Sequence, residues 1–455
     1  MGSGDQSRAA VVGSGHSREI LRLAVPAFLA LVAEPLFLLA DSAIIGHLGT
    51  PQLAGLGVAS ATLITAANIF VFLAYGTTSI VARQIGAGST RGALEAGIDG
   101  TWLAVGLGAL TSAAVAWGAP ALCRLFGASD AAVGYAATYL RISSLGIPAM
   151  LVALAATGVL RGLQDTRTPL AASAAGFTGN IALNLLFVYG LGWGIAGSAW
   201  GTVIAQTAMA AALVVVMTRH ARRAGAALRS HPARVLRAGL SGIPLLVRTL
   251  ALRGVLLLTT WVAAGLGDVP LAAHQVAATV WSFLAFALDA LAIAAQALTG
   301  KALGAGDVSR ARRATTTMVR WGSWGGVLLG VAVLALHDVI PLAFTRDEPV
   351  RAALGAALVV VALGQPLSGF VFVVDGVLIG AGDGRWLAKA MLATLVLYAP
   401  LAIAVHEAGT RLLVAGAPTA LTALWVAFTL FMAIRGAFFA WRIWGDAWAV
   451  TGAAR

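Results

Sequence analysis

Long apolar segments recur along this chain from end to end. Each is about 20 residues or longer and is bounded by glycine, proline or charged residues. A helix of that length crosses the hydrocarbon core of a bilayer, and in lipid it satisfies its own backbone polar groups. The pattern predicts an all-α integral membrane protein with twelve transmembrane helices. They lie near residues 20–46, 52–76, 93–120, 131–158, 169–191, 195–218, 237–265, 271–297, 314–338, 350–378, 387–406 and 412–440.

The charge content supports this class of protein and excludes others. Only 11% of the residues are charged and 59% are hydrophobic, whereas soluble domains carry about 25% charged residues. The net charge of +12 does not indicate a nucleic-acid partner, because the basic residues fall in alternate loops and not on one face. The single cysteine, Cys123, rules out an intrachain disulfide and a cysteine-rich metal site.

The basic loops also predict the orientation in the membrane. Loops on the opposite side carry little basic charge: 47–51 and 191–195 have no Lys or Arg, and another holds the near-balanced set Arg346, Asp347, Glu348 and Arg351. Under the positive-inside rule the basic loops and both termini are cytoplasmic, in a multi-pass protein of the cell (inner or plasma) membrane. The basic segments are 83–91, 161–167, 219–234, 301–313 and 385–389.

An internal repeat divides the chain into two halves. Pro26 matches Pro244, and LGTPQLAG at 48–55 matches LGDVPLAA at 266–273, each at an offset of 218 residues. The repeat predicts two pseudo-symmetric lobes of six parallel-oriented helices around a central cleft, which is a transporter plan. The predicted limits are a flexible tail 1–17, an N-lobe 18–218, a basic cytoplasmic linker 219–236, a C-lobe 237–440 and a cytoplasmic tail 441–455.

Four acidic residues fall well inside the predicted spans: Glu34, Asp41, Asp289 and Asp375. A charge at mid-bilayer costs about 2.5–3.5 kcal/mol on insertion scales, so such residues usually mark an ion or proton path. Burial favours the neutral carboxyl, which makes a buried acid a plausible proton carrier. The repeat places Thr259 where Asp41 would have its counterpart, and a lobe-specific acid indicates function more than fold maintenance.

Polar side chains on neighbouring spans offer Asp41 partners. Asn180 and Asn184 are four residues apart and therefore share one helix face. Tyr139 and Thr202 add hydroxyl groups from spans 4 and 6. These groups can hydrogen-bond Asp41 in either protonation state, or their oxygens can coordinate Na⁺. Ordinary interhelical hydrogen bonding is the alternative role.

The other acids are candidates for the substrate cleft, together with two basic residues on span 7. Asp289 and Asp375 either act in transport or pair with Arg248 and Arg253, because an isolated buried charge is costly. Glu34 is also a candidate, although no comparable polar partners can be named for it.

Several stretches resemble the multidrug and toxic compound extrusion (MATE) family, in particular its DNA-damage-inducible F-type (DinF) branch. The resemblance extends over nearly the whole chain at matching spacing. It is carried by AEPLFLLADSAIIGHLG at 33–49, IGAGS at 85–89, LAAHQV at 271–276, FALDALAIAAQAL at 286–298 and FVVDGVLIGAGD at 372–383.

The resemblance implies a V-shaped pair of lobes that exports amphipathic, often cationic compounds in exchange for H⁺ or Na⁺. Asp41 matches the central coupling residue of related prokaryotic members, and Tyr139, Asn180 and Thr202 match the polar residues around it. Some relatives have a second Asp where this chain has Asn184. Hard cations prefer charged oxygen ligands, so the loss of that carboxylate favours H⁺ over Na⁺.

The predicted function is therefore a monomeric, cation-coupled antiporter in which protonation of Asp41 drives release of a small amphipathic substrate. No G-x-x-x-x-G-K-[ST] motif occurs, so ATP-driven transport, enzymatic activity and a cofactor are not expected. No resident metal is expected, with Na⁺ at Asp41, Asn180 and Asn184 as the alternative coupling ion. The alternatives are an exporter of organic anions such as citrate, a lipid-linked precursor flippase and a non-transporting membrane scaffold.

Overall fold

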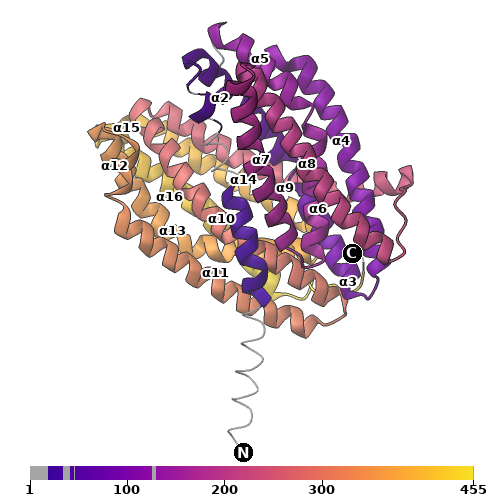
Figure 1. Cartoon of the computed structure of the whole chain (residues 1–455). Coiled ribbons are helices and arrows are strands. Elements are labelled where there is room, and N and C mark those ends of the chain that lie inside the picture. The colour runs from indigo at the N-terminus through magenta and orange to yellow at the C-terminus, as the bar shows by residue number, and fades with distance from the viewer. Residues whose placement is uncertain (1–18, 34–40, 42, 46, 126–129, 454–455) are drawn as a thin grey trace, which may run out of the picture. The chain divides into compact units, whose positions relative to one another are not determined.

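The computed structural model describes residues 19–33, 41, 43–45, 47–125 and 130–453 (Figure 1). Every regular element among them is helical. The chain forms two compact units, one of residues 25–246 and one of residues 247–453 together with the N-terminal stretch up to residue 24. Each unit is described by itself below.

The first unit contains the helical residues 25–33, which continue a helix described from residue 19, and eight further elements. A bend of 50° separates α5 from α6, with Pro148 in the first turn of α6. The elements are α2 (Thr50–Phe70), α3 (Phe72–Gly86), α4 (Thr90–Leu125), α5 (Asp130–Ser144), α6 (Ile147–Gly162), α7 (Arg167–Leu185), the π-helical turn η1 (Leu186–Gly190) and α8 (Gly194–Arg223).

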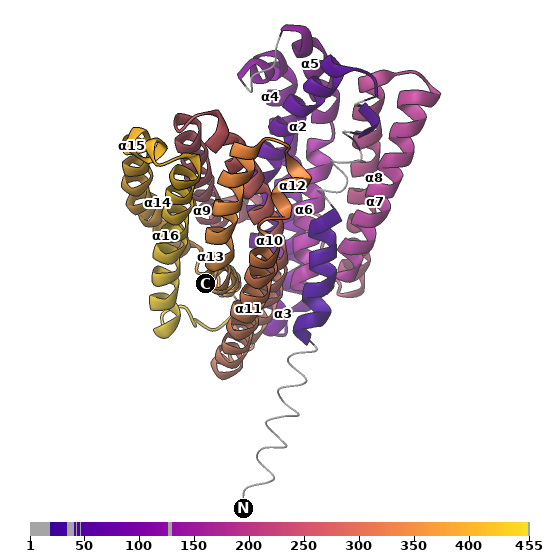
Figure 2. The same cartoon turned by 90° about the vertical axis from the view of Figure 1, so that its left-hand side faces the viewer.

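The second unit begins within α9 (Pro232–Gly265) and continues to the C-terminal end. In it α13 packs against α10, α11 and α16 (Figure 2). The elements after α9 are α10 (Asp268–Gly304), α11 (Val308–Leu336), α12 (Ile340–Phe344), α13 (Glu348–Gly380), α14 (Gly384–Glu407), α15 (Gly409–Val414) and α16 (Ala417–Trp444).

The helices confirm the predicted all-α membrane fold. Among the described residues, 10 helices are long and apolar enough to cross a membrane, or 11 if the bent pair α5–α6 is one span. They correspond one for one to the second through twelfth predicted spans. The first predicted span, 20–46, includes residues outside the described ones. The layout is therefore that of a multi-pass membrane protein with two six-helix lobes.

Glycine residues allow the long helices of the second unit to approach closely. A Cβ atom on Gly326 would lie 2.2 Å from the Gln365 carbonyl oxygen, and one on Gly369 would lie 1.9 Å from the Gly322 carbonyl oxygen. Because lipid is as apolar as these helices, close backbone packing of small residues is what holds α11 and α13 together.

The basic segment between α8 and α9 is held against α4. The Arg234 guanidinium pairs with Asp99 (Nε–Oδ2 2.8 Å) and with Glu95 (Nη1–Oε2 3.5 Å), and Ser230 donates a hydrogen bond to Asp99. The predicted linker 219–236 includes the last turn of α8 and the first turn of α9. Its limits as a domain boundary stay a prediction.

The residues after α16 pack onto the second unit. Trp448 is 1% exposed, and the Gly452 amide donates to the Leu303 carbonyl at the end of α10 (3.1 Å). The predicted tail 441–455 therefore begins inside α16, and its described part is docked.

Candidate functional site

Asp41 is the centre of a buried polar cluster in the first unit. Its side chain is 2% exposed, and three donors from three other helices converge on its carboxylate. Ser198 Oγ on α8 and Asn184 Nδ2 on α7 donate to Oδ1 at 2.7 and 2.8 Å. Tyr139 Oη on α5 donates to Oδ2 at 3.3 Å. The cluster thus links the predicted first span to α5, α7 and α8.

The hydrogen bonds continue away from Asp41 along α7. Asn184 Nδ2 also donates to Asn180 Oδ1 (2.8 Å), and Asn180 Nδ2 donates to Thr202 Oγ1 on α8 (3.0 Å). The i, i+4 spacing of the two asparagines places them on one face, as predicted. Asn180 therefore reaches Asp41 through Asn184, and Thr202 reaches it through the two asparagines and through a hydrogen bond with Tyr139. Within the described residues Asn184 Oδ1 has no hydrogen-bond partner.

Two members of this neighbourhood were missed by sequence reasoning. Ser198 lies one helical turn before Thr202 on α8, so its i, i+4 spacing was a usable signal. Tyr189 lies in η1 and donates to the Ile44 carbonyl, one turn after Asp41, at 2.6 Å. Single π turns frequently occur at functional sites, but no residue pattern in this stretch predicted one.

The second repeat has a polar contact at the corresponding place, without a carboxylate. Thr259 Oγ1 and Tyr398 Oη lie 2.6 Å apart, at the positions 218 residues after Asp41 and Asn180. All the equivalent positions are buried. The counterparts of Asp41, Tyr139, Asn180 and Asn184 are Thr259, Ala357, Tyr398 and Ala402. Of the two sets of equivalent positions, only the one in the first repeat holds a carboxylate, Asp41.

A separate ion cluster lies inside the second unit. The Asp375 carboxylate on α13 contacts Arg248 on α9 (Nε–Oδ1 3.0 Å, with a closer Nη2–Oδ2 contact) and Arg435 on α16 (Nη2–Oδ2 3.1 Å). All three side chains are buried, and Arg435 also lies over the Phe439 ring at 5.0 Å. Arg248 was among the expected partners of Asp375. Arg435 was missed, although a basic residue inside the apolar run of span 12 was a visible signal.

The remaining residues predicted to line the substrate cleft are Asp289, Arg253 and Glu34. Asp289 on α10 and Arg253 on α9 are both half-buried. Glu34 lies outside the described residues. Asp289, Asp375, Arg248 and Arg253 all belong to the unit 247–453, whereas Asp41 and its partners belong to the unit 25–246. Their predicted role in a common substrate cleft stays a prediction.

The three groups that contact the Asp41 carboxylate are all hydrogen-bond donors. Asp41 is the one carboxylate in its hydrogen-bonded cluster, and the described residues contain no group of three or more His, Cys, Asp or Glu that would hold a metal. Asn184 directs its amide nitrogen at Asp41, whereas Na⁺ requires oxygen ligands. The arrangement can therefore hold a carboxylate in either charge state, with donors in place for the ionised one.

Comparison with known families finds one match that occurs twice. The sequence model of the family described as MatE matches residues 26–186 and again residues 244–404. The two matches begin 218 residues apart, which is the offset of the internal repeat.

Individual relatives match over most of their length. Protein DETOXIFICATION 44, chloroplastic, of Arabidopsis thaliana is 32% identical over 441 residues, covering 93% of this chain and 82% of the relative. DNA damage-inducible protein F of Escherichia coli (strain K12) is 28% identical over 445 residues, covering 96% and 93%.

Solved structures share the fold. A MATE structure in the bent conformation has a TM-score of 0.85 at 22% identity and covers 95% of this chain and 96% of that one. A variant of the Vibrio cholerae MATE transporter VcmN has a TM-score of 0.85 at 19% identity and covers 96% and 99%.

Proposed function

Because the chain belongs to the MatE family of multi-pass membrane transporters, we propose that it is a proton-coupled antiporter that exports amphipathic, often cationic compounds. The observation that carries the proposal is the single buried carboxylate of Asp41 with three converging donors. Asp41 is the proton-binding residue. Tyr139, Asn184 and Ser198 position it, and Asn180 and Thr202 position Asn184.

Two opposing influences make Asp41 suitable for reversible proton binding. Burial away from water favours the neutral carboxyl, whereas three hydrogen bonds donated to its oxygens favour the ionised carboxylate. A group held between these influences changes its charge with modest changes in its surroundings. Asn184 supplies an amide where a second carboxylate would strengthen cation binding, which favours H⁺ over Na⁺.

Protonation changes what the cluster can bond. A neutral Asp41 has one O–H that donates, so one of the three present donors loses its acceptor. Asn184 Oδ1 is a buried acceptor in the same cluster, and a turn of that amide lets it receive the new proton's hydrogen bond. In an outward-open state this rearrangement lowers substrate affinity, the substrate leaves, and the proton is released to the cytoplasm after the lobes change conformation.

The substrate class rests on the relatives. Several are named as multidrug resistance proteins, including a probable NorM of Pseudomonas syringae that is 28% identical over 342 residues. Export of organic anions would instead be supported by unneutralised arginines at the transport site. Arg248 is in ion-pair contact with Asp375, so it does not favour that alternative.

The coupling ion is tested by imposing one gradient at a time. In proteoliposomes that contain the full chain, a pH gradient is expected to drive ethidium transport, because proton uptake at Asp41 is the coupling step. A Na⁺ gradient of the same size is expected to drive none. Collapse of the pH gradient by nigericin is the control. Transport driven by Na⁺ at constant pH would overturn proton coupling and leave the transporter assignment intact.

Gly201→Ala is expected to impair transport without unfolding the protein. The added Cβ would lie 2.1 Å from Asn184 Oδ1, so the Asn184 side chain must shift, which disturbs its hydrogen bond to Asp41. A hydrogen bond to a charged group contributes about 1.5–3 kcal/mol, so we expect about a tenfold or larger loss of pH-driven ethidium transport.

Gly179→Ala is the matched control, because its Cβ on α7 meets nothing within 4 Å. Both variants are compared at equal amounts of monodisperse protein. Unchanged transport by the Gly201 variant would show that the position of Asn184 is not important for coupling.

A further inference from the structure

Tyr189 contacts the backbone of the first predicted span at a second point, beyond Asp41. Its Oη donates to the Ile44 carbonyl at 2.6 Å, about one helical turn after Asp41. The last carbonyls of a helix have no partner within the helix, so a side chain can supply one. His47 Nδ1 does this for the neighbouring Ala43 carbonyl at 2.7 Å. Two side chains therefore cap the C-terminal end of this span.

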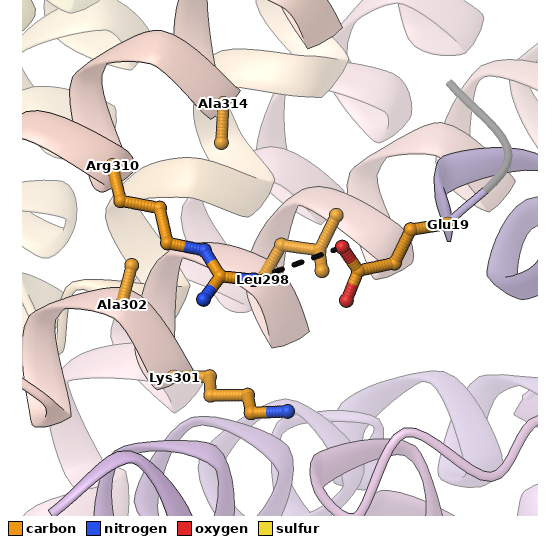
Figure 3. Close-up of a pocket in the computed structure, with 6 residues that line it drawn as sticks. All are labelled: Glu19, Leu298, Lys301, Ala302, Arg310 and Ala314. Atoms are coloured by element: carbon orange, nitrogen blue, oxygen red, sulfur yellow. Dashed lines mark ion pairs between the residues drawn. The ribbon is translucent and has the colours of Figure 1, made fainter. Parts of the chain in front are cut away.

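The N-terminal end of the same span has a looser polar contact. Glu19 faces Arg310 across a small pocket where α10 ends and α11 begins (Figure 3). Glu19 Oε2 and Arg310 Nη2 lie 3.9 Å apart, and the two side chains are 32% and 47% exposed. An exposed pair of this kind contributes little to stability. Of these polar contacts, the short ones at Asp41 and Ile44 therefore hold the span more firmly.

The π-helical turn η1 explains how Asn184 and Tyr189 both reach the first span. In a regular α-helix, side chains five residues apart point about 140° away from each other. A π turn closes hydrogen bonds between residues five apart, so such residues come close to one face. In η1 the Leu191 amide donates to the Leu186 carbonyl at 2.8 Å. Asn184 and Tyr189 can therefore contact the same helix from either side of the turn.

The turn η1 is held closely against the start of α8. The Trp193 amide donates to the Phe187 carbonyl at 2.9 Å, and the two rings stack with their centroids 5.2 Å apart. A Cβ atom on Gly197 would lie 2.8 Å from the Phe187 carbonyl carbon, so the two backbones are in close contact. Tyr189 is therefore carried on the framework that also carries Ser198.

The second repeat lacks this arrangement. The positions 218 residues after Ile44 and Tyr189 are Val262 and Glu407. Glu407 is exposed and ends α14, which is a regular α-helix over its whole length. The tyrosine and the π turn thus occur in the repeat that holds the buried acid, Asp41. A role in folding alone would be expected in both copies, so this difference indicates a role at Asp41.

We propose that Tyr189 is a positioning residue for proton binding at Asp41, and that its hydroxyl holds the first span where Asp41 meets its three donors. This inference rests on the proposed function. Because Tyr189 bonds a backbone carbonyl, its contact does not depend on the charge of Asp41. When protonation costs one donor its acceptor, the span stays attached at Ile44. Asp41 then returns to the same donors after the proton leaves.

Tyr189→Phe removes the hydroxyl and keeps the ring. The end of the first span is then held less firmly, so the hydrogen bonds to Asp41 weaken on average. These bonds favour the ionised carboxylate, so the variant should take up its proton at a higher pH. The side chains that face Asp41 are Tyr139 on α5, Asn184 on α7 and Ser198 on α8, and none of them carries a charge at neutral pH.

The test is a pH titration of ethidium binding to the purified full chain, followed by fluorescence anisotropy. The wild type is expected to release ethidium as acidification neutralises Asp41. In Tyr189→Phe the midpoint of release should lie at higher pH by roughly half a pH unit, because one neutral hydrogen bond is lost. The affinity on the alkaline side of the midpoint should equal that of the wild type.

Tyr135→Phe is the matched control, because it removes the hydroxyl of an exposed tyrosine on α5 and should leave the midpoint unchanged. An unchanged midpoint in Tyr189→Phe would overturn the inference and leave Asp41 as the proton-binding residue. Affinity lost equally at every pH, with a lower melting temperature than Tyr135→Phe, would also overturn it, since that result indicates a purely structural role. Wild-type binding that does not respond to pH would contradict proton coupling itself, and the inference with it.

Discussion

The Asp41→Asn variant is expected to lose proton-driven export completely while it remains folded. Asparagine has nearly the shape of aspartate and keeps one oxygen that accepts from Ser198, Asn184 or Tyr139, but it cannot bind a proton. One proton crossing about 100 mV supplies roughly 2.3 kcal/mol, which sustains about a fifty-fold gradient of a neutral substrate. The variant should sustain no gradient.

The measurement is ethidium efflux in everted vesicles with an imposed pH gradient, compared at equal expression. Asp338→Asn removes the same charge from a side chain that is 85% exposed, and it should behave as wild type. Substrate binding to purified protein separates coupling from recognition, because the variant should still bind ethidium. A wild-type rate of efflux in the Asp41 variant would rule out Asp41 as the coupling residue.

The Asp375→Asn variant is expected to be strongly destabilised. Its carboxylate is contacted by both Arg248 and Arg435, and the variant keeps two neighbouring buried guanidiniums without that shared negative charge. Removing one partner of a buried ion pair typically lowers stability by about 3–5 kcal/mol. The loss should appear as a lower melting temperature of the purified protein in detergent.

Arg435→Gln is the internal comparison for that result. It removes one of the two cations and leaves the contact between Arg248 and Asp375, so its destabilisation should be clearly smaller. Both variants are measured by fluorescence-detected size-exclusion chromatography after heating. Equal losses, or a larger loss for Arg435→Gln, would contradict a cluster in which the carboxylate joins the two arginines.

The number of helices, the repeat and the identity of the central acid could all be predicted from local patterns. Apolar run length determines whether a helix can span a bilayer, and it needs no knowledge of the helix's neighbours. The repeat was visible because Pro26 and Pro244 keep the same spacing as the segments around them. Asn180 and Asn184 were placed on one face by helical periodicity alone.

Partner choice between helices was not predictable in the same way. A membrane helix is apolar on all sides, so its hydrophobic pattern does not indicate which neighbour it contacts. Close glycine packing and a few polar contacts decide this, and both depend on how backbones approach in three dimensions. Arg435 and Asp375 lie on different helices, and Ser198 donates to Asp41, which is 157 residues away in the sequence.

Asp41 is the clearest example of both kinds of information, that from local sequence patterns and that from the packing of helices. The sequence alone shows that Asp41 lies in an apolar span and that its counterpart in the repeat is Thr259, which is not an acid. Because a charge in lipid is costly wherever it occurs, these two facts already indicate a functional role. Only the packed helices show that Ser198 and Asn184 contact Asp41 directly, whereas Asn180 contacts it through Asn184. Hydrogen bonds form only within about 3.5 Å, and only tertiary packing brings side chains from separate helices to that distance.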